Sequence, residues 1–180
     1  MNYLPEIESL SRVTWDFFGT LTFKFDAQKP HQYGRALRMW HQFGRTVAAG
    51  FRGDKRRWPY LIWCLRGEHG EHTARWHYHF LLSGTPKLSV NRSSCFAMME
   101  MWRQCGGGHP EIFVFDKRQA GVAYVTKCLD PGSHWESRKF GIAESLTLSD
   151  SFFRVMKANS MMKDRQLAQL ERQAERARQA

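Results

Sequence analysis

Residues 60–82 read YLIWCLRGEHGEHTARWHYHFLL, and this stretch decides the fold. Residues 60–68 and 76–82 are dominated by apolar and aromatic side chains, whereas the residues between them are mostly polar or glycine. Two apolar runs joined by a short polar segment predict two strands that pair as a β-hairpin.

The side chains of the second strand alternate in character, and successive side chains of a strand point to opposite faces of a sheet. One face is wholly apolar: Trp76, Tyr78, Phe80 and Leu82. His77 and His79 lie on the other face, which we therefore expect to be open rather than part of the core. If the hairpin pairs Glu68 with His77, the carboxylate and both imidazoles converge, because opposed residues point to the same side.

Glu68, His77 and His79 therefore predict a divalent metal site on the open face. Two imidazole nitrogens and one carboxylate, with positions left for water and phosphate, suit Mn²⁺ or Mg²⁺. Zinc also accepts these ligands, so the pattern alone does not choose the metal. The neighbouring His69 and His72 fall in the predicted turn, and we expect both on the surface.

The segments on either side of the hairpin alternate between strand and helix patterns. Residues 15–25 and 111–116 are strand-like, while apolar residues recur at helical spacing in 31–50, 89–104 and 118–129. The resulting order of elements matches the split βαβ plan. We expect an α+β fold with a central antiparallel sheet of about five strands in a ferredoxin- or RRM-like arrangement. Its helices should pack on one face and the active site should lie on the other.

The composition changes near the C-terminus. After residue 150 the chain contains no glycine or proline and has many good helix formers together with an excess of basic residues. We therefore divide the chain into a domain at 1–148, which carries the site, and a basic helical extension at 149–180.

The whole chain is basic, with 27 Lys and Arg against 17 Asp and Glu and a formal net charge of +10. A small basic chain favours polyanionic partners, of which nucleic acid is the default. No stretch approaches the roughly 18 apolar residues of a membrane span, so we expect no membrane-spanning helix. The four cysteines form no C-x-x-C pair, which argues against a zinc ribbon. Cys64 and Cys128 lie in apolar runs as expected of small core residues, and a reduced, cytoplasmic setting fits best.

A basic loop precedes the hairpin. Arg56 and Arg57 could follow the phosphates of a nucleic acid, and Trp58 could stack on a base. The alternative is a solvated loop in which Trp58 begins the next strand.

Tyr124 and Lys127 lie three residues apart in the predicted helix 118–129, so they share one face of it. An amphipathic helix with a half-buried tyrosine would also explain this spacing. Together with Glu68 and the triplet 77–79, however, it resembles the HUH endonucleases, in particular the single-tyrosine initiators of rolling-circle replication in plasmids, phages and small single-stranded DNA viruses. The segment FGTLTF at 18–23 is similar to the first motif of that family, and all three motifs follow the family's order.

The resemblance implies a role for each matching residue of the site. His77 and His79 would bind the divalent ion, with Glu68 as the third ligand. Tyr124 would attack a phosphate of single-stranded DNA, which leaves a 5′-phosphotyrosine and a free 3′-hydroxyl. Lys127 would assist at the phosphate or position the ion.

The resemblance also implies the partners. Thr20 and Thr22, with Lys24 beside them, would line the DNA-facing side of the sheet. The substrate would be single-stranded or hairpin DNA at a replication origin. Because the chain has no G-x-x-x-x-G-K-[ST] stretch, a host helicase and the host replication machinery would have to open the duplex, in the cytoplasm of a bacterial cell.

Two other functions remain open. A transposase of the same superfamily would keep the chemistry but act on the ends of a mobile element. A non-catalytic nucleic-acid-binding module on a ferredoxin-like sheet would instead expose aromatic residues on the open face. The polar residues expected there, Glu68, His77, His79 and the two threonines of β-strand 15–25, favour catalysis.

Overall fold

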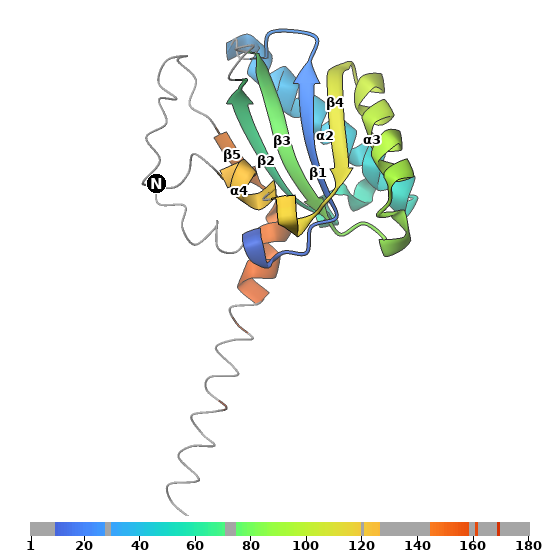
Figure 1. Cartoon of the computed structure of the whole chain (residues 1–180), viewed down its shortest axis with the longest axis vertical. Helices are drawn as coiled ribbons and strands as arrows, with labels where there is room; N and C mark the ends of the chain where they lie inside the picture. Colours follow the sequence, from blue (N-terminus) through green and yellow to red (C-terminus); the bar gives the residue numbers. More distant parts are fainter. Residues whose placement is uncertain are drawn as a thin grey trace, which may run out of the picture.

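The structure of the protein is a computed structural model that describes residues 10–27, 30–70, 75–119, 121–126 and 145–158, together with 161 and 169. Its helices and strands follow one another as β1 (Phe17–Phe23), α2 (Pro30–Arg52), β2 (Ile62–His69), β3 (Trp76–Ser83), α3 (Arg92–Gln104), β4 (Gly107–Val114), α4 (Gly121–Thr126) and β5 (Ser145–Leu148). The predicted α+β class, with an antiparallel sheet and packed helices, is confirmed (Figure 1).

The described strands pair in antiparallel fashion throughout. β4, β1, β3 and β2 lie side by side in that order, and the short β5 pairs with the outer edge of β2. The register places Thr20 of β1 opposite His79, and Glu68 of β2 opposite His77. Because opposed residues share a face, side chains from three neighbouring strands meet on one side of β3.

One face of the sheet carries the main core. α2 and α3 lie across this face (Figure 1), and the apolar stripe of β3 is buried beneath them as predicted. The helices contribute Ala36, Trp40, Phe43, Val47, Met98 and Trp102. Phe80 packs against the rings of Trp40 and Phe43, with centroids 5.4 and 6.1 Å away. Burial of these aromatic side chains is the main stabilising contribution on this side.

Helices also cover part of the opposite face, which differs from the expectation. A second buried cluster there consists of Leu10, Trp15, Cys64, Leu81, Val125 and Phe152. Cys64 and Leu81 oppose each other on β2 and β3 and share the face of the two histidines. Val125 of α4 and Phe152 of the helical segment 150–158 pack against them. The prediction of helices on one face only is therefore wrong, because both faces carry apolar side chains that must be removed from water.

β4 begins at Gly107 rather than at the predicted residue 111, so the GGGHP stretch continues the strand. β4 lies at an edge of the sheet, where Pro110 is tolerated although it has no N–H to donate. A Cβ atom at Gly107 would lie 2.1 Å from Nε1 of Trp102. The glycine is thus required for the close approach of α3, and it does not mark a loop.

The remaining boundaries agree with the predicted ones to within a few residues. Of the predicted helix 118–129, α4 covers 121–126, and 127–129 lie outside the described residues. The C-terminal extension is helical at 150–158, as predicted. Among the described helices, none combines the length and the apolar character that crossing a membrane requires.

Candidate metal centre

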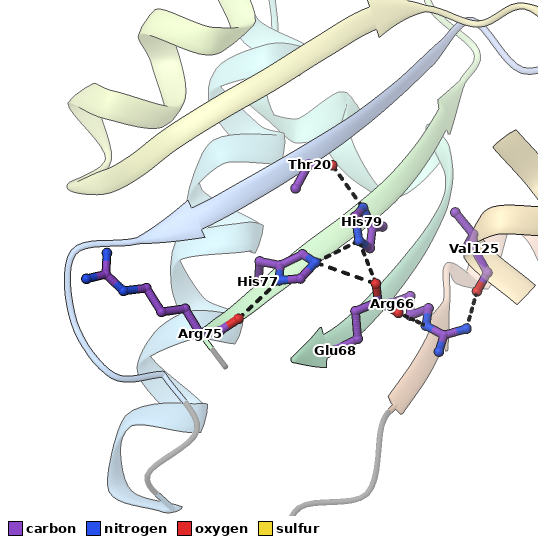
Figure 2. A network of polar contacts seen from close by, with 7 residues as sticks. All are labelled: Thr20, Arg66, Glu68, Arg75, His77, His79 and Val125. Atoms are coloured by element: carbon purple, nitrogen blue, oxygen red, sulfur yellow. Dashed lines mark hydrogen bonds and ion pairs between the residues drawn. The ribbon is translucent and has the colours of Figure 1, made fainter. Parts of the chain in front are cut away.

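Glu68, His77 and His79 come together on the face of the sheet opposite the main core (Figure 2). One donor atom from each side chain lies within 4.8 Å of the other two. The hairpin causes this convergence, because Glu68 lies opposite His77 and His79 follows two residues later on the same face. The predicted pairing is confirmed, and the three side chains meet as expected.

The three donor atoms form a compact and largely buried set. Glu68 Oε1 lies 2.9 Å from Nε2 of His79 and 3.5 Å from Nε2 of His77. The two Nε2 atoms are 2.8 Å apart. Glu68 and His79 are each 3% exposed, whereas His77 keeps 13% of its side chain exposed. The set therefore opens to solvent on the side of His77.

The second ring nitrogen of each histidine contacts an oxygen atom. His77 Nδ1 lies 3.1 Å from the carbonyl oxygen of Arg75, which can only accept, so this nitrogen carries the proton. His79 Nδ1 lies 2.9 Å from Oγ1 of Thr20, and its N–H can donate to that hydroxyl. Nε2 of each ring faces Glu68 Oε1, so it would release any proton that it carries there when a metal ion binds and leave the proton on Nδ1, which is the usual arrangement of metal-binding histidines. The donor set thus fits a divalent metal ion.

A buried arginine belongs to the same cluster, and the sequence analysis missed it. Arg66 is 1% exposed, and its Nε lies 3.0 Å from Glu68 Oε2. Its Nη1 donates to the carbonyl oxygen of Val125 in α4 at 3.0 Å (Figure 2). The two oxygens of Glu68 therefore serve different partners, Oε2 the guanidinium and Oε1 the histidines. Spacing alone could have revealed Arg66, since it precedes Glu68 by two residues in a strand and shares its face.

The surroundings of Glu68 keep its carboxyl group ionised. Burial by itself raises the pKa of this group. The hydrogen bonds with His77 and His79 and the positive charges beside it outweigh burial and hold the pKa of Glu68 well below its ordinary value. An ionised carboxylate is the form that a metal ligand must take.

His69 belongs to the other face, so its expected surface position is wrong. β2 continues through His69, which is 8% exposed and packs edge-on against Trp76 with ring centroids 4.9 Å apart. Burial, followed by the charge of His77, lowers the pKa of His69. His72 lies outside the described residues.

The helix that carries Tyr124 lies beside the metal ligands. The backbone of Tyr124 belongs to α4 and directly precedes Val125, whose carbonyl group binds Arg66. The side chain of Tyr124 and the whole of Lys127 lie outside the described part of the chain. The backbone of the predicted nucleophile thus adjoins a residue that contacts Arg66, the ion-pair partner of Glu68.

Two of the residues predicted to face DNA lie on the same side of the sheet as the metal ligands. Thr20 and Thr22 oppose His79 and His77 in the register of β1 and β3. Thr20 contacts His79 directly, whereas the hydroxyl of Thr22 donates to the carbonyl oxygen of residue 109 at 2.8 Å. Lys24 follows the end of β1 and is exposed.

The predicted basic loop lies at the far end of β2. The 3-10 helix Lys55–Tyr60 immediately precedes this strand, whereas Glu68 lies close to its last residue. At about 3.3 Å per residue, the separation along the strand is roughly 20 Å. Arg56 is exposed and pairs at 3.1 Å with a carboxylate of the same loop, and Arg57 lies over a neighbouring aromatic ring. The side chain of Trp58 lies outside the described residues.

An exposed aromatic side chain on the site face was also missed. Phe113 of the edge strand β4 is 54% exposed and lies opposite Phe18 of β1. Phe18 in turn opposes Leu81 of β3, which has the same orientation as the histidines. Phe113 therefore presents an aromatic ring on the same side of the sheet as the metal ligands.

Comparisons with protein-family models, with curated proteins and with solved structures found no significant match to this chain. The fold and the site themselves define the class, an α+β protein in which one glutamate and two histidines could bind a divalent metal ion.

Proposed function

We propose that the protein is a metal-dependent endonuclease that nicks and rejoins single-stranded DNA at a specific sequence, in the manner of the single-tyrosine HUH initiators of rolling-circle replication. The observation that carries this proposal is the convergence of Glu68, His77 and His79 next to the helix that contains Tyr124. The strand order β4-β1-β3-β2, with a helix before the β2–β3 hairpin and another after it, agrees with the ferredoxin-like split βαβ plan and supports the assignment.

In this proposal Mn²⁺ or Mg²⁺ is bound by Glu68, His77 and His79. When bound, the ion supplies positive charge that polarises the scissile phosphate. Thr20 orients the ring of His79 through its Nδ1 atom, and the carbonyl of Arg75 does the same for His77.

The chemical step is a transfer of the phosphodiester from DNA to the tyrosine. The phenolic oxygen of Tyr124 forms a bond to phosphorus while the bond between phosphorus and the 3′ oxygen breaks. The phenol gives up its proton and the leaving 3′ oxygen gains one, which yields a 5′-phosphotyrosine and a free 3′-hydroxyl. The ammonium group of Lys127 offsets the negative charge that develops. Because the covalent bond conserves the phosphodiester energy, the reverse attack rejoins the strands.

The site face offers further groups for DNA. Thr20 and Thr22 share the face of the candidate metal ligands, and in this proposal they contact DNA together with Lys24, while the ring of Phe113 can stack on a base. Arg56 and Arg57, at the far end of β2, would contact a more distant part of the strand, together with Trp58. The net charge of +10 favours such contacts. We further propose that the protein acts in the bacterial cytoplasm, where a host helicase opens the duplex and the host replication machinery copies the DNA.

The exposed ring of Phe113 supports a second candidate function, a non-catalytic module that binds single strands by stacking. A module of this kind does not require a metal and forms no covalent bond. A tyrosine transposase would share the chemistry of the first proposal and differ in the DNA that it recognises.

The first prediction concerns covalent attachment. The full-length protein is incubated with a random-sequence pool of single-stranded and hairpin oligonucleotides, with Mn²⁺, with Mg²⁺ or with EDTA. We expect a covalent protein–DNA adduct in the presence of metal, which mass analysis of the peptides locates at Tyr124. Tyr124→Phe should abolish the adduct, because the phenylalanine ring has no oxygen nucleophile.

Tyr60→Phe is the matched control, since this tyrosine is 61% exposed and lies before β2, away from the metal ligands. It should form the adduct like the unmodified protein. An adduct on another residue, or one that persists in Tyr124→Phe, contradicts the assignment of the nucleophile. DNA binding that is indifferent to EDTA, without any adduct, favours the non-catalytic module.

A further inference from the structure

The guanidinium group of Arg66 spans the space between the metal ligands and α4 (Figure 2). Its Nε lies 3.0 Å from Glu68 Oε2, and its Nη1 lies 3.0 Å from the carbonyl oxygen of Val125. We propose that Arg66 is a positioning residue that fixes α4 relative to the metal ligands. The consequence for catalysis rests on the proposed function, because it concerns the helix that carries Tyr124.

The contact with Val125 acts on a helix that is weakly held by itself. The described part of α4 spans 6 residues, and most of the stability of short helical segments in proteins comes from tertiary contacts. The carbonyl oxygen of Val125 accepts a hydrogen bond from Arg66 Nη1, a side-chain donor that comes from the sheet and not from the helix itself. The Val125 side chain is buried in the second cluster, but apolar burial is not directional. The hydrogen bond from Arg66 is directional, so it can orient α4 in a way that apolar packing cannot.

The contact with Glu68 connects this anchor to the metal site. The guanidinium group is planar, and its donors have a fixed spacing. The ion pair with Glu68 Oε2 and the hydrogen bond from Nη1 to the Val125 carbonyl therefore hold these two oxygen atoms on the same guanidinium group. The same contact leaves Glu68 Oε1 directed at His77 and His79. Arg66 thus sets where the residue before Val125, Tyr124, stands relative to the metal ligands.

The experiment compares Arg66→Lys with Arg103→Lys in the full chain. A lysine at position 66 keeps the positive charge beside Glu68, but it is a single point donor and cannot reproduce both contacts of the fork. Arg103 is the matched control, because this exposed arginine of α3 also pairs with a carboxylate, that of Glu100 at 3.4 Å. Both variants replace an arginine with a lysine, in one case in the buried cluster and in the other on the surface of α3.

The first measurement is amide hydrogen exchange of the segment 121–126 without metal or DNA. We expect exchange to become faster by roughly tenfold or more in Arg66→Lys, with no change in Arg103→Lys. Equal exchange in Arg66→Lys and in the unmodified protein overturns the proposal. This result does not depend on the protein's activity, so it separates the failure of the anchor from the failure of the proposed function.

The second measurement separates metal binding from chemistry. We expect Arg66→Lys to change Mn²⁺ affinity by less than about threefold, while the single-turnover rate of adduct formation falls by about a hundredfold, because misplacement of a reacting group by about 1 Å has an effect of that size. A parallel loss of affinity and rate would assign Arg66 to metal binding and overturn the positioning role.

A third measurement covers the case in which Arg66→Lys does not fold. In the unmodified protein, NMR of the guanidinium groups should show the Nη protons of Arg66 as separate, slowly exchanging signals, because both contacts restrict rotation. Exposed Arg103 should give averaged signals. Averaged signals from Arg66 would overturn the proposal.

Discussion

The two faces of β3 differ in what their side chains do, although they alternate along one strand. Phe80 lies at the centre of the main core, whereas its neighbour His79 binds Glu68 and Thr20 on the other side. The apolar face gains its free energy from removal of carbon surface from water, and the site face holds a few polar groups at defined distances. Side chains on one face of β3 therefore stabilise the fold and those on the other face form the candidate site, although the two kinds of residue alternate along the sequence.

The site face is itself divided along the strands. Toward one end, Cys64 and Leu81 are buried under α4 and the segment 150–158. Toward the other end, Glu68 and His77 carry donor atoms of the candidate metal site. Arg66 stands at the boundary and contacts both parts. The apolar cover and the polar cluster thus occupy adjacent parts of this face.

The largest expected effect is a loss of stability when the apolar face of β3 is altered. Phe80→Ala should lower the free energy of unfolding by about 3–5 kcal/mol, because Phe80 is 0% exposed and its loss leaves a cavity beside Trp40 and Phe43. Urea denaturation measures the change. The Mn²⁺ affinity of the molecules that remain folded should stay within about twofold, as expected for separable sites. A large loss of affinity per folded molecule would show that the two faces are not separate.

The next largest effect is a loss of Mn²⁺ affinity when a candidate ligand on the site face is replaced. His79→Gln should weaken Mn²⁺ binding by at least about 100-fold, more than the loss of an outer contact costs, and lower the free energy of unfolding by only about 1 kcal/mol. Calorimetric titration gives the affinity. His109→Gln is the control, since this histidine is 73% exposed and lies on β4. Unchanged affinity in His79→Gln would remove this residue from the metal site.

The smallest expected effect is on Mn²⁺ affinity when a residue that contacts a candidate ligand, and not the ligand itself, is replaced. Thr20→Val keeps the shape of the side chain but removes the hydroxyl next to His79 Nδ1. Mn²⁺ affinity should fall by about tenfold, because the imidazole loses the contact that orients it. Thr46→Val removes a comparable hydroxyl from the surface of α2, where it donates to the carbonyl of Gln42, and should leave affinity unchanged. Equal affinities in both variants would show that Thr20 does not orient the ring.

Much of the hairpin could be predicted from local pattern. The alternation in residues 76–82 separated His77 and His79 from the buried aromatic residues, and the polar segment before it placed the turn. The pairing of Glu68 with His77, which the sequence analysis assumed, is confirmed by the register of β2 and β3. These features depend on neighbouring residues, for which side-chain direction follows directly from strand geometry.

Other features depend on residues far apart in the chain, and the sequence analysis missed or misplaced them. Arg66 looked like one polar residue within an apolar run, since its partner Val125 is distant in the sequence. His69 was placed in the turn, because its burial depends on how far β2 continues along β3. The cover of Cys64 and Leu81 by α4 was not foreseen for the same reason.

The amino-acid sequence alone determined the types of the elements from β1 to α4, the two faces of β3 and the three candidate metal ligands, whereas β5 was not predicted. Only the tertiary structure decided that α4 contacts Arg66 and that helices also cover part of the site face. The physical reason is that backbone geometry and side-chain alternation are local, whereas the choice of which apolar groups bury one another is made by the whole chain at once.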